Sequence, residues 1–129
     1  MDKAKDVLNV LLVDDCKDFR LLMKEHFEQL HYKVTEADDG YEALQLLKQH
    51  QFYLTIMDLK MPLLDGISTA RSFREWESQQ NRTPARLVAL TAFSLPMDRD
   101  NTIKAGFDEF MRKPYDCADL GPMITRMIG

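Results

Sequence analysis

Short apolar runs alternate with segments of helical periodicity along this chain, and this alternation most restricts the folds that the chain can adopt. The expected strands are residues 7–13, 33–37, 52–57, 87–90 and 109–112. Between them, apolar residues recur three and four positions apart, which is the period of an amphipathic helix. Strands separated by helices pair in parallel through right-handed crossovers. We therefore expect an α/β fold with a doubly wound five-stranded parallel sheet, order 2-1-3-4-5, in a flavodoxin-like (βα)5 arrangement.

The inward faces of the expected helices follow from the same periodicity. The first helix carries apolar residues at helical spacing, namely Phe19, Leu22, Met23, Phe27 and Leu30. The fourth, residues 94–105, has only Met97, Ile103 and Ala105 as inward candidates, so we expect it to be held less firmly. The final helix runs toward Ile128. Because Pro122 disrupts a helix beyond its first turn, we expect this helix either to start late, near Asp119, or to be kinked.

Length and composition limit the classes of function. A chain of 129 residues is enough for one domain, 1–129, with a real core. The net charge of −4, without a basic block, gives no reason to expect direct binding of nucleic acid. No stretch resembles a signal peptide or a membrane span, so no membrane insertion is expected. Cys16 and Cys117 lack metal-ligand spacing and fit a reducing compartment, which favours a cytoplasmic location.

Polar side chains stand at the carboxyl ends of four of the expected strands. Asp14 and Asp15 follow the first strand, Asp58 the third, Thr91 the fourth and Lys113 the fifth. In the expected strand order the chain reverses direction between strands one and three, and ligands of open α/β sheets bind in the crevice at that point. We therefore expect the three aspartates to meet there.

The charges of these residues favour a divalent cation. Three adjacent carboxylates repel one another, and with Lys113 the site sums to −2, which one divalent ion cancels. Mg²⁺ prefers hard oxygen ligands, keeps several waters and takes its remaining ligands from phosphate oxygens. The pattern therefore indicates phosphate chemistry at this edge of the sheet.

Taken together, these residues resemble the receiver (CheY-like) domains of two-component response regulators, over nearly the whole chain. The resemblance rests on four motifs: Asp14-Asp15, the D-x-x-M-P-x-x-D-G run from Asp58 to Gly66, Thr91-Ala92, and Lys113-Pro114. Residues 90–94, 98–99 and 105–108 look particularly like receivers attached to hybrid histidine kinases. Both a stand-alone regulator and a receiver excised from a larger protein remain open.

The family resemblance implies a role for each residue of the site. Asp58 would be the nucleophile that takes a phosphoryl group from a phosphohistidine on a sensor histidine kinase or a histidine phosphotransfer protein. Asp15 and Asp58 would bind Mg²⁺ directly, with the main-chain carbonyl of Lys60 as a third ligand, and Asp14 would hold the ion through water. Mn²⁺ would substitute for Mg²⁺. Thr91 and Lys113 would neutralise charge on the phosphoryl oxygens.

The resemblance also implies a switch and a class of activity. The ring of Phe110 would turn inward as Thr91 moves, which would remodel the fourth helix, fifth strand and final helix for a downstream protein target. The domain would not be an enzyme, although it would promote its own Mg²⁺-dependent phosphorylation and dephosphorylation. Two alternatives are a scaffold that is never phosphorylated and a magnesium-dependent phosphatase. The phosphatase usually has a second acid two residues after its nucleophile, where this chain has Lys60.

Overall fold

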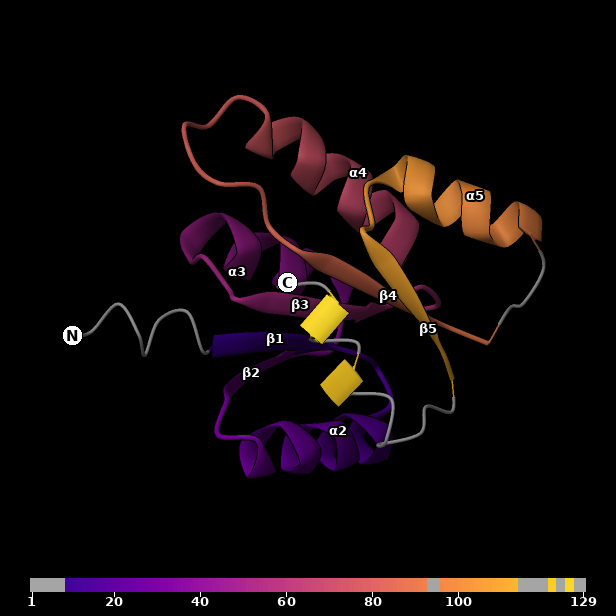
Figure 1. Cartoon of the computed structure of the whole chain (residues 1–129). Coiled ribbons are helices and arrows are strands. Elements are labelled where there is room, and N and C mark those ends of the chain that lie inside the picture. The colour runs from indigo at the N-terminus through magenta and orange to yellow at the C-terminus, as the bar shows by residue number, and fades with distance from the viewer. Residues whose placement is uncertain (1–8, 93–95, 114–120, 123–124, 127–129) are drawn as a thin grey trace.

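Five parallel strands form one sheet in the order β2-β1-β3-β4-β5 in the computed structural model (Figure 1). The structure describes residues 9–92, 96–113, 121–122 and 125–126. The strands are β1 (Asn9–Val13), β2 (Lys33–Ala37), β3 (Leu54–Asp58), β4 (Leu87–Thr91) and β5 (Glu109–Arg112). The expected fold class and strand order are therefore confirmed. β3 begins later than predicted, since Phe52 is buried in the core from the preceding loop and its apolar character does not mark a strand.

Helices cover both faces of the sheet. They are α2 (Lys17–Gln29), α3 (Gly40–Gln49), α4 (Gly66–Glu77) and α5 (Pro96–Ala105). Figure 1 shows α2 on one side of the sheet and α3, α4 and α5 on the other. No helix in the described part of the chain has the length and apolar character needed to cross a bilayer. Most of the predicted final helix, including Asp119 and Ile128, lies outside the described residues.

The side chains of each strand divide between two cores with a period of two. In β1, Val10 and Leu12 pack with the α2 side, while Leu11 and Val13 pack with the side of α3 and α4. β1 lies in the interior of the sheet and is covered on both faces, which explains its nearly continuous apolar sequence. Burial on both faces fixes the strand register, and the register fixes which residue ends each strand.

Three apolar residues predicted to face inward are exposed instead. Leu22 is 48% exposed, Leu30 45% and Ile103 45%. In α2 the buried stripe consists of Met23 and Phe27, four residues apart, and Leu22 lies roughly 100° around the helix from Met23. Leu30 follows the last helical residue. In α5 the buried described side chains are Thr102 and Ala105, three residues apart, and the side chain of Met97 lies outside the described part.

A left-handed residue ends α2. His31 has φ 70°, and its N–H donates to the Glu28 carbonyl while the N–H of Tyr32 donates to the Phe27 carbonyl, both at 3.0 Å. The rings of Phe27 and Tyr32 meet edge to face, with centroids 5.8 Å apart. This is a Schellman termination, in which glycine is the usual residue at the left-handed position.

His31→Gly should stabilise the protein, because glycine adopts a positive φ without the steric cost that a β-carbon imposes. The expected increase in the free energy of unfolding is about 0.5–1 kcal/mol by urea denaturation. Glu28→Gly is the matched control. Glu28 is an exposed residue inside the helix, so glycine there should lower the free energy of unfolding by about 1 kcal/mol. A destabilised His31→Gly protein would contradict the assignment of this helix end.

Candidate functional site

Asp58 is the last residue of β3, which lies at the centre of the sheet between β1 and β4. It is only 7% exposed, and the backbone N–H of Lys60 donates to its Oδ1 at 3.1 Å. The start of α4 packs directly on this strand end. A β-carbon at Gly66 would lie 2.6 Å from the carbonyl oxygen of Asp58, so only glycine allows this close approach.

Asp65 acts as the N-cap of α4 and accepts a hydrogen bond from the Ser68 N–H at 2.7 Å. Asp followed by Gly is typical of a turn at the start of a helix, and this hydrogen bond shows that Asp65 has that role. The side chain therefore helps to fix the loop that follows Asp58.

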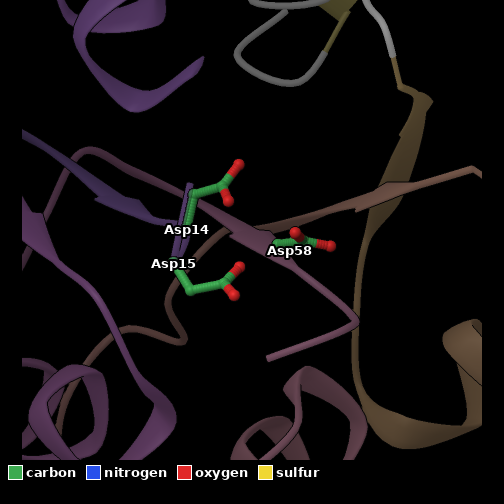
Figure 2. Close-up of side chains that lie close together, drawn as sticks. All are labelled: Asp14, Asp15 and Asp58. Atoms are coloured by element: carbon green, nitrogen blue, oxygen red, sulfur yellow. The ribbon is translucent and has the colours of Figure 1, made fainter. Parts of the chain in front are cut away.

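Asp14 and Asp15 follow β1 and join Asp58 in one cluster. Each of the three offers a carboxylate oxygen, and these oxygens lie within 4.8 Å of one another. Figure 2 shows the three side chains together at the ends of their strands. Asp14 is 2% exposed and accepts the Cys16 N–H at 2.9 Å, whereas Asp15 is exposed and has no hydrogen-bond partner among the described residues. The strand order thus brings the three acids together, as predicted.

Lys113 supplies the positive charge of the cluster from the end of β5. Its Nζ lies 2.8 Å from Oδ2 of Asp14 and 3.0 Å from Oδ2 of Asp58. Burial acts to lower the pKa of Lys113, but the hydrogen bonds to Asp14 and Asp58 outweigh it and the pKa is raised. Lys113 is therefore an ammonium at neutral pH, and three carboxylates with one ammonium leave a charge of −2.

The remaining predicted site residues, Thr91, Lys60 and Phe110, do not all lie at the acidic cluster. Thr91 ends β4, is 5% exposed and accepts the Lys113 N–H at its carbonyl oxygen, 2.8 Å away. Lys60 is exposed beside the cluster. Phe110 is half-buried on β5, where the Arg99 guanidinium of α5 lies 5.3 Å from its ring centroid. Thr91 and Lys60 therefore flank the acids, and Phe110 belongs to the neighbouring surface.

A hollow beside the acids is suited to a small hydrated cation. It has a volume of about 390 Å³ and is lined by Asp15, Leu59, Lys60, Met61, Pro62 and Asp65. Within the described part of the chain, no hydrogen bond reaches the carboxylate oxygens of Asp15. Hard oxygen donors next to open solvent fit Mg²⁺. A larger cavity of about 670 Å³, lined by residues such as Asn9, Phe52 and Arg86, has no carboxylate in its lining. The acidic hollow is therefore the candidate cation site.

Arg20 of α2 also contacts the site, although no sequence motif marked it. Its Nη1 donates to the carbonyl oxygen of Asp14 at 2.6 Å, and its Nε donates to Oε1 of Glu36 at 2.8 Å. Lys24 reaches the other Glu36 oxygen at 3.3 Å. The hydrogen bond from Arg20 holds the pKa of Glu36 below its ordinary value, with help from Lys24, although burial opposes the shift. Arg20 thus ties the end of β1 to β2.

The sequence contains a signal for this contact, but the signal can be recognised only once the register of β1 against β2 is known. Glu36 lies opposite Leu12 in the β1–β2 ladder, one residue before the pair formed by Val13 and Ala37. An acid so near the end of a strand, with an arginine in the first turns of the adjoining helix, is a pair that only the parallel register brings into contact.

Comparison with known proteins identifies a family model, described as the response regulator receiver domain, which matches residues 10–125. The sensor histidine kinase GacS of Pseudomonas protegens is 33% identical over 120 residues, which cover 93% of this chain and 13% of that protein. The chain likewise spans 13% and 11% of two further kinases that it matches. The chain thus corresponds to a small part of these relatives.

Solved structures with similar sequences share the fold. The Saccharomyces cerevisiae receiver domain of Ssk1, crystallised with the histidine phosphotransfer protein Ypd1, is 29% identical with a TM-score of 0.86, covering 91% of this chain and 86% of that one. The receiver domain of the sensor kinase PA1611 from Pseudomonas aeruginosa is 31% identical with a TM-score of 0.80, covering 92% and 94%. That structure has a magnesium ion in its active site cleft.

Glu36→Gln should reduce stability in a pH-dependent way. Because the folded-state pKa of Glu36 is lowered, its contribution is present above the unfolded-state value and is lost as the pH falls through the folded-state value. At pH 7 the variant should be less stable by about 0.5–1 kcal/mol, and the difference should vanish in acid. Glu25→Gln, at an exposed position of α2, should change little at any pH. A constant deficit across the range would contradict the ion-pair origin.

Lys113→Met should destabilise the protein in the absence of divalent ions by about 2–3 kcal/mol, because two buried carboxylates lose their cation. Thermal unfolding with and without millimolar Mg²⁺ measures the effect. The ion should raise the melting temperature of this variant more than that of the wild type, since the site charge changes from −2 to −3. Lys104→Met, at an exposed position in the last turn of α5, is the control. If Mg²⁺ raised the melting temperatures of Lys113→Met and of the wild type equally, this would argue against a cation in this hollow.

Proposed function

Because this chain belongs to the response regulator receiver domain family, we propose that Asp58 is the residue on which it accepts a phosphoryl group in a two-component phosphorelay. The observation that carries this proposal is the surroundings of Asp58. Its Oδ2 contacts the Lys113 ammonium at 3.0 Å, and two further acids lie within 4.8 Å. A nucleophilic carboxylate beside a cation and a metal-binding pair is the arrangement that phosphoryl transfer requires.

The transfer step uses the side chains of the site in distinct roles. A carboxylate oxygen of Asp58 attacks the phosphorus atom of a phosphohistidine, the P–N bond breaks, and the imidazole leaves with the electron pair of that bond. Lys113 and Thr91 stabilise the negative charge on the phosphoryl oxygens. Mg²⁺, held by Asp15, Asp58 and the carbonyl of Lys60 and through water by Asp14, would supply further charge neutralisation; Mn²⁺ shares these oxygen ligands and would substitute.

The charge of the site changes on phosphorylation and provides the signal. The side chains sum to −2 before transfer, and one divalent cation brings the total to zero. Replacing the −1 of Asp58 by a dianionic acyl phosphate brings it to −1. We infer that this added charge draws Thr91 and Lys113 toward the phosphoryl group. The same side chains would allow the receiver to promote its own phosphorylation and dephosphorylation, both dependent on Mg²⁺.

The surface beside Phe110 is the proposed output of the switch. Arg99 lies over its ring at 5.3 Å, so an inward turn of the ring would separate α5 from β5 at this contact. An element with two arrangements of similar energy is what a phosphorylation switch requires. We propose that α5, β5 and the final helix present the altered surface to a downstream protein.

The phosphodonor is proposed to be a sensor histidine kinase or a histidine phosphotransfer protein. The similar Ssk1 receiver was crystallised with such a phosphotransfer protein. In this chain Leu63 is 79% exposed and has φ 70°, an uncommon conformation for a bulky residue, in the loop that leads away from Asp58. This exposed apolar side chain, five residues after Asp58, is available for contact with a protein that delivers a phosphohistidine.

Intact-mass measurement after incubation with acetyl phosphate and Mg²⁺ tests the proposal. The wild type should gain one phosphoryl group, and borohydride trapping of the acyl phosphate followed by peptide mapping should locate it at Asp58. Asp58→Asn should remain unmodified, whereas Asp39→Asn, at the N-cap of α3 and outside the lining of the acidic hollow, retains a capping side chain and should be modified like the wild type. A chelator should abolish the gain. An unmodified wild type would favour the phosphorylation-independent scaffold.

A further inference from the structure

Lys113 has a third contact, with a residue that the site chemistry does not use. The ring of Phe19, in the first turn of α2, lies over the ammonium, with 4.5 Å between Nζ and the ring centroid. The carboxylates of Asp14 and Asp58 contact the same ammonium at 2.8 and 3.0 Å. The lysine head group is therefore bounded both by carboxylates and by an aromatic face.

The distance and the burial make this an effective cation–π contact. An ammonium within about 6 Å of a ring centroid is attracted by the negative face of the ring, more strongly where water is excluded. Lys113 retains 23% of its side-chain exposure, and Phe19 is half-buried against the α2 side of the core. The core thus fixes the ring, and the ring limits the positions open to a side chain with a long flexible stem.

We propose that Phe19 is a positioning residue that keeps the Lys113 ammonium directed at Asp58 during phosphoryl transfer. This inference rests on the proposed function, because it assigns Phe19 a role in that reaction. The contact itself involves only protein atoms, so it is present before any cation or phosphoryl group arrives.

An aromatic face suits a cation that must move. During transfer the ammonium has to follow charge from Oδ2 of Asp58 to the oxygens of the incoming phosphoryl group. A third hydrogen-bonding neighbour, in addition to Asp14 and Asp58, would add another directional contact that this movement has to weaken. The attraction of a ring face is spread over its area, so the ammonium can shift by a short distance and remain bound.

Fluorinated phenylalanines at position 19 separate this electrostatic role from packing. One, two and three ring fluorines weaken the negative face stepwise while the size of the ring changes little. The rate of phosphorylation by acetyl phosphate at saturating Mg²⁺ should fall stepwise, to about one fifth for the trifluorinated ring, the rate equivalent of about 1 kcal/mol. The same substitutions at Phe27, buried in α2 and in contact with Tyr32, should leave the rate unchanged.

A second measurement requires neither metal nor phosphate. In the wild type, the ε-methylene protons of Lys113 should show an upfield ring-current shift in nuclear magnetic resonance spectra. Phe19→Leu should remove this shift, and Phe19→Tyr, which retains the ring, should preserve it. Thermal unfolding of each variant establishes that it is folded under the conditions used.

The two measurements distinguish failure of this inference from failure of the proposed function. A phosphorylation rate that is independent of fluorination at position 19 would overturn the positioning role, even with the ring-current shift present. Loss of the shift in Phe19→Leu together with the stepwise rates would support it. If the wild type were never phosphorylated on Asp58, the proposed function would fall, and the positioning role with it, while the ring-current shift would still report the contact.

Discussion

The ion pairs of Lys113 with Asp14 and Asp58 are the interaction on which the rest of this structure depends. Asp14 and Asp58 are almost completely buried, and a buried carboxylate without a partner would cost several kcal/mol. Here the ammonium and the backbone N–H groups of Cys16 and Lys60 satisfy their oxygens. One lysine therefore stabilises the ends of β1 and β3 and leaves a net negative charge that a divalent cation can neutralise.

This arrangement requires a parallel sheet with its carboxyl ends on one edge. Lys113 is 99 residues from Asp14 and 55 from Asp58 in the sequence, and only the order β2-β1-β3-β4-β5 makes them neighbours. Contacts around the site then fix the strand ends. Arg20 binds the carbonyl of Asp14, and Gly66 lets α4 approach Asp58 closely. The site is thus rigid on the side of β1 and β3, which suits a nucleophile that must be aligned with its phosphodonor.

Two cation–π contacts lie on the side from which a response would spread. Phe19 faces the ammonium of Lys113, and Arg99 faces the ring of Phe110. The attraction of each ring is non-directional and opposes a short shift of the cation only weakly, although Lys113 is also held by its ion pairs with Asp14 and Asp58. A receiver needs a fixed acceptor and an adjustable neighbouring surface. Hydrogen bonds fix the ends of β1 and β3, whereas the contact between Arg99 and Phe110 joins α5 to β5 without one.

Much of the fold and of the acidic cluster could be predicted from the sequence, because both depend on local pattern. Apolar runs separated by helical periodicity indicate parallel strands, and Asp14, Asp15, Asp58, Thr91 and Lys113 stand where those strands end. The motif spacing around these residues was sufficient to indicate the receiver family. These features survive small errors in element boundaries, as the later start of β3 shows.

The contacts between helices and strands could not be predicted from the sequence, because they depend on the tertiary structure. Periodicity placed Leu22 and Ile103 inside, but the surface that a helix buries depends on its rotation against the sheet, and both are exposed. Periodicity likewise gives no pairing of Arg20 with Glu36, which the register of β2 brings into contact. The ring of Phe19 over Lys113 joins residues from α2 and the end of β5, far apart in the chain. Such pairings follow from side-chain conformation and packing in three dimensions, and the spacing of residues along the sequence does not predict them.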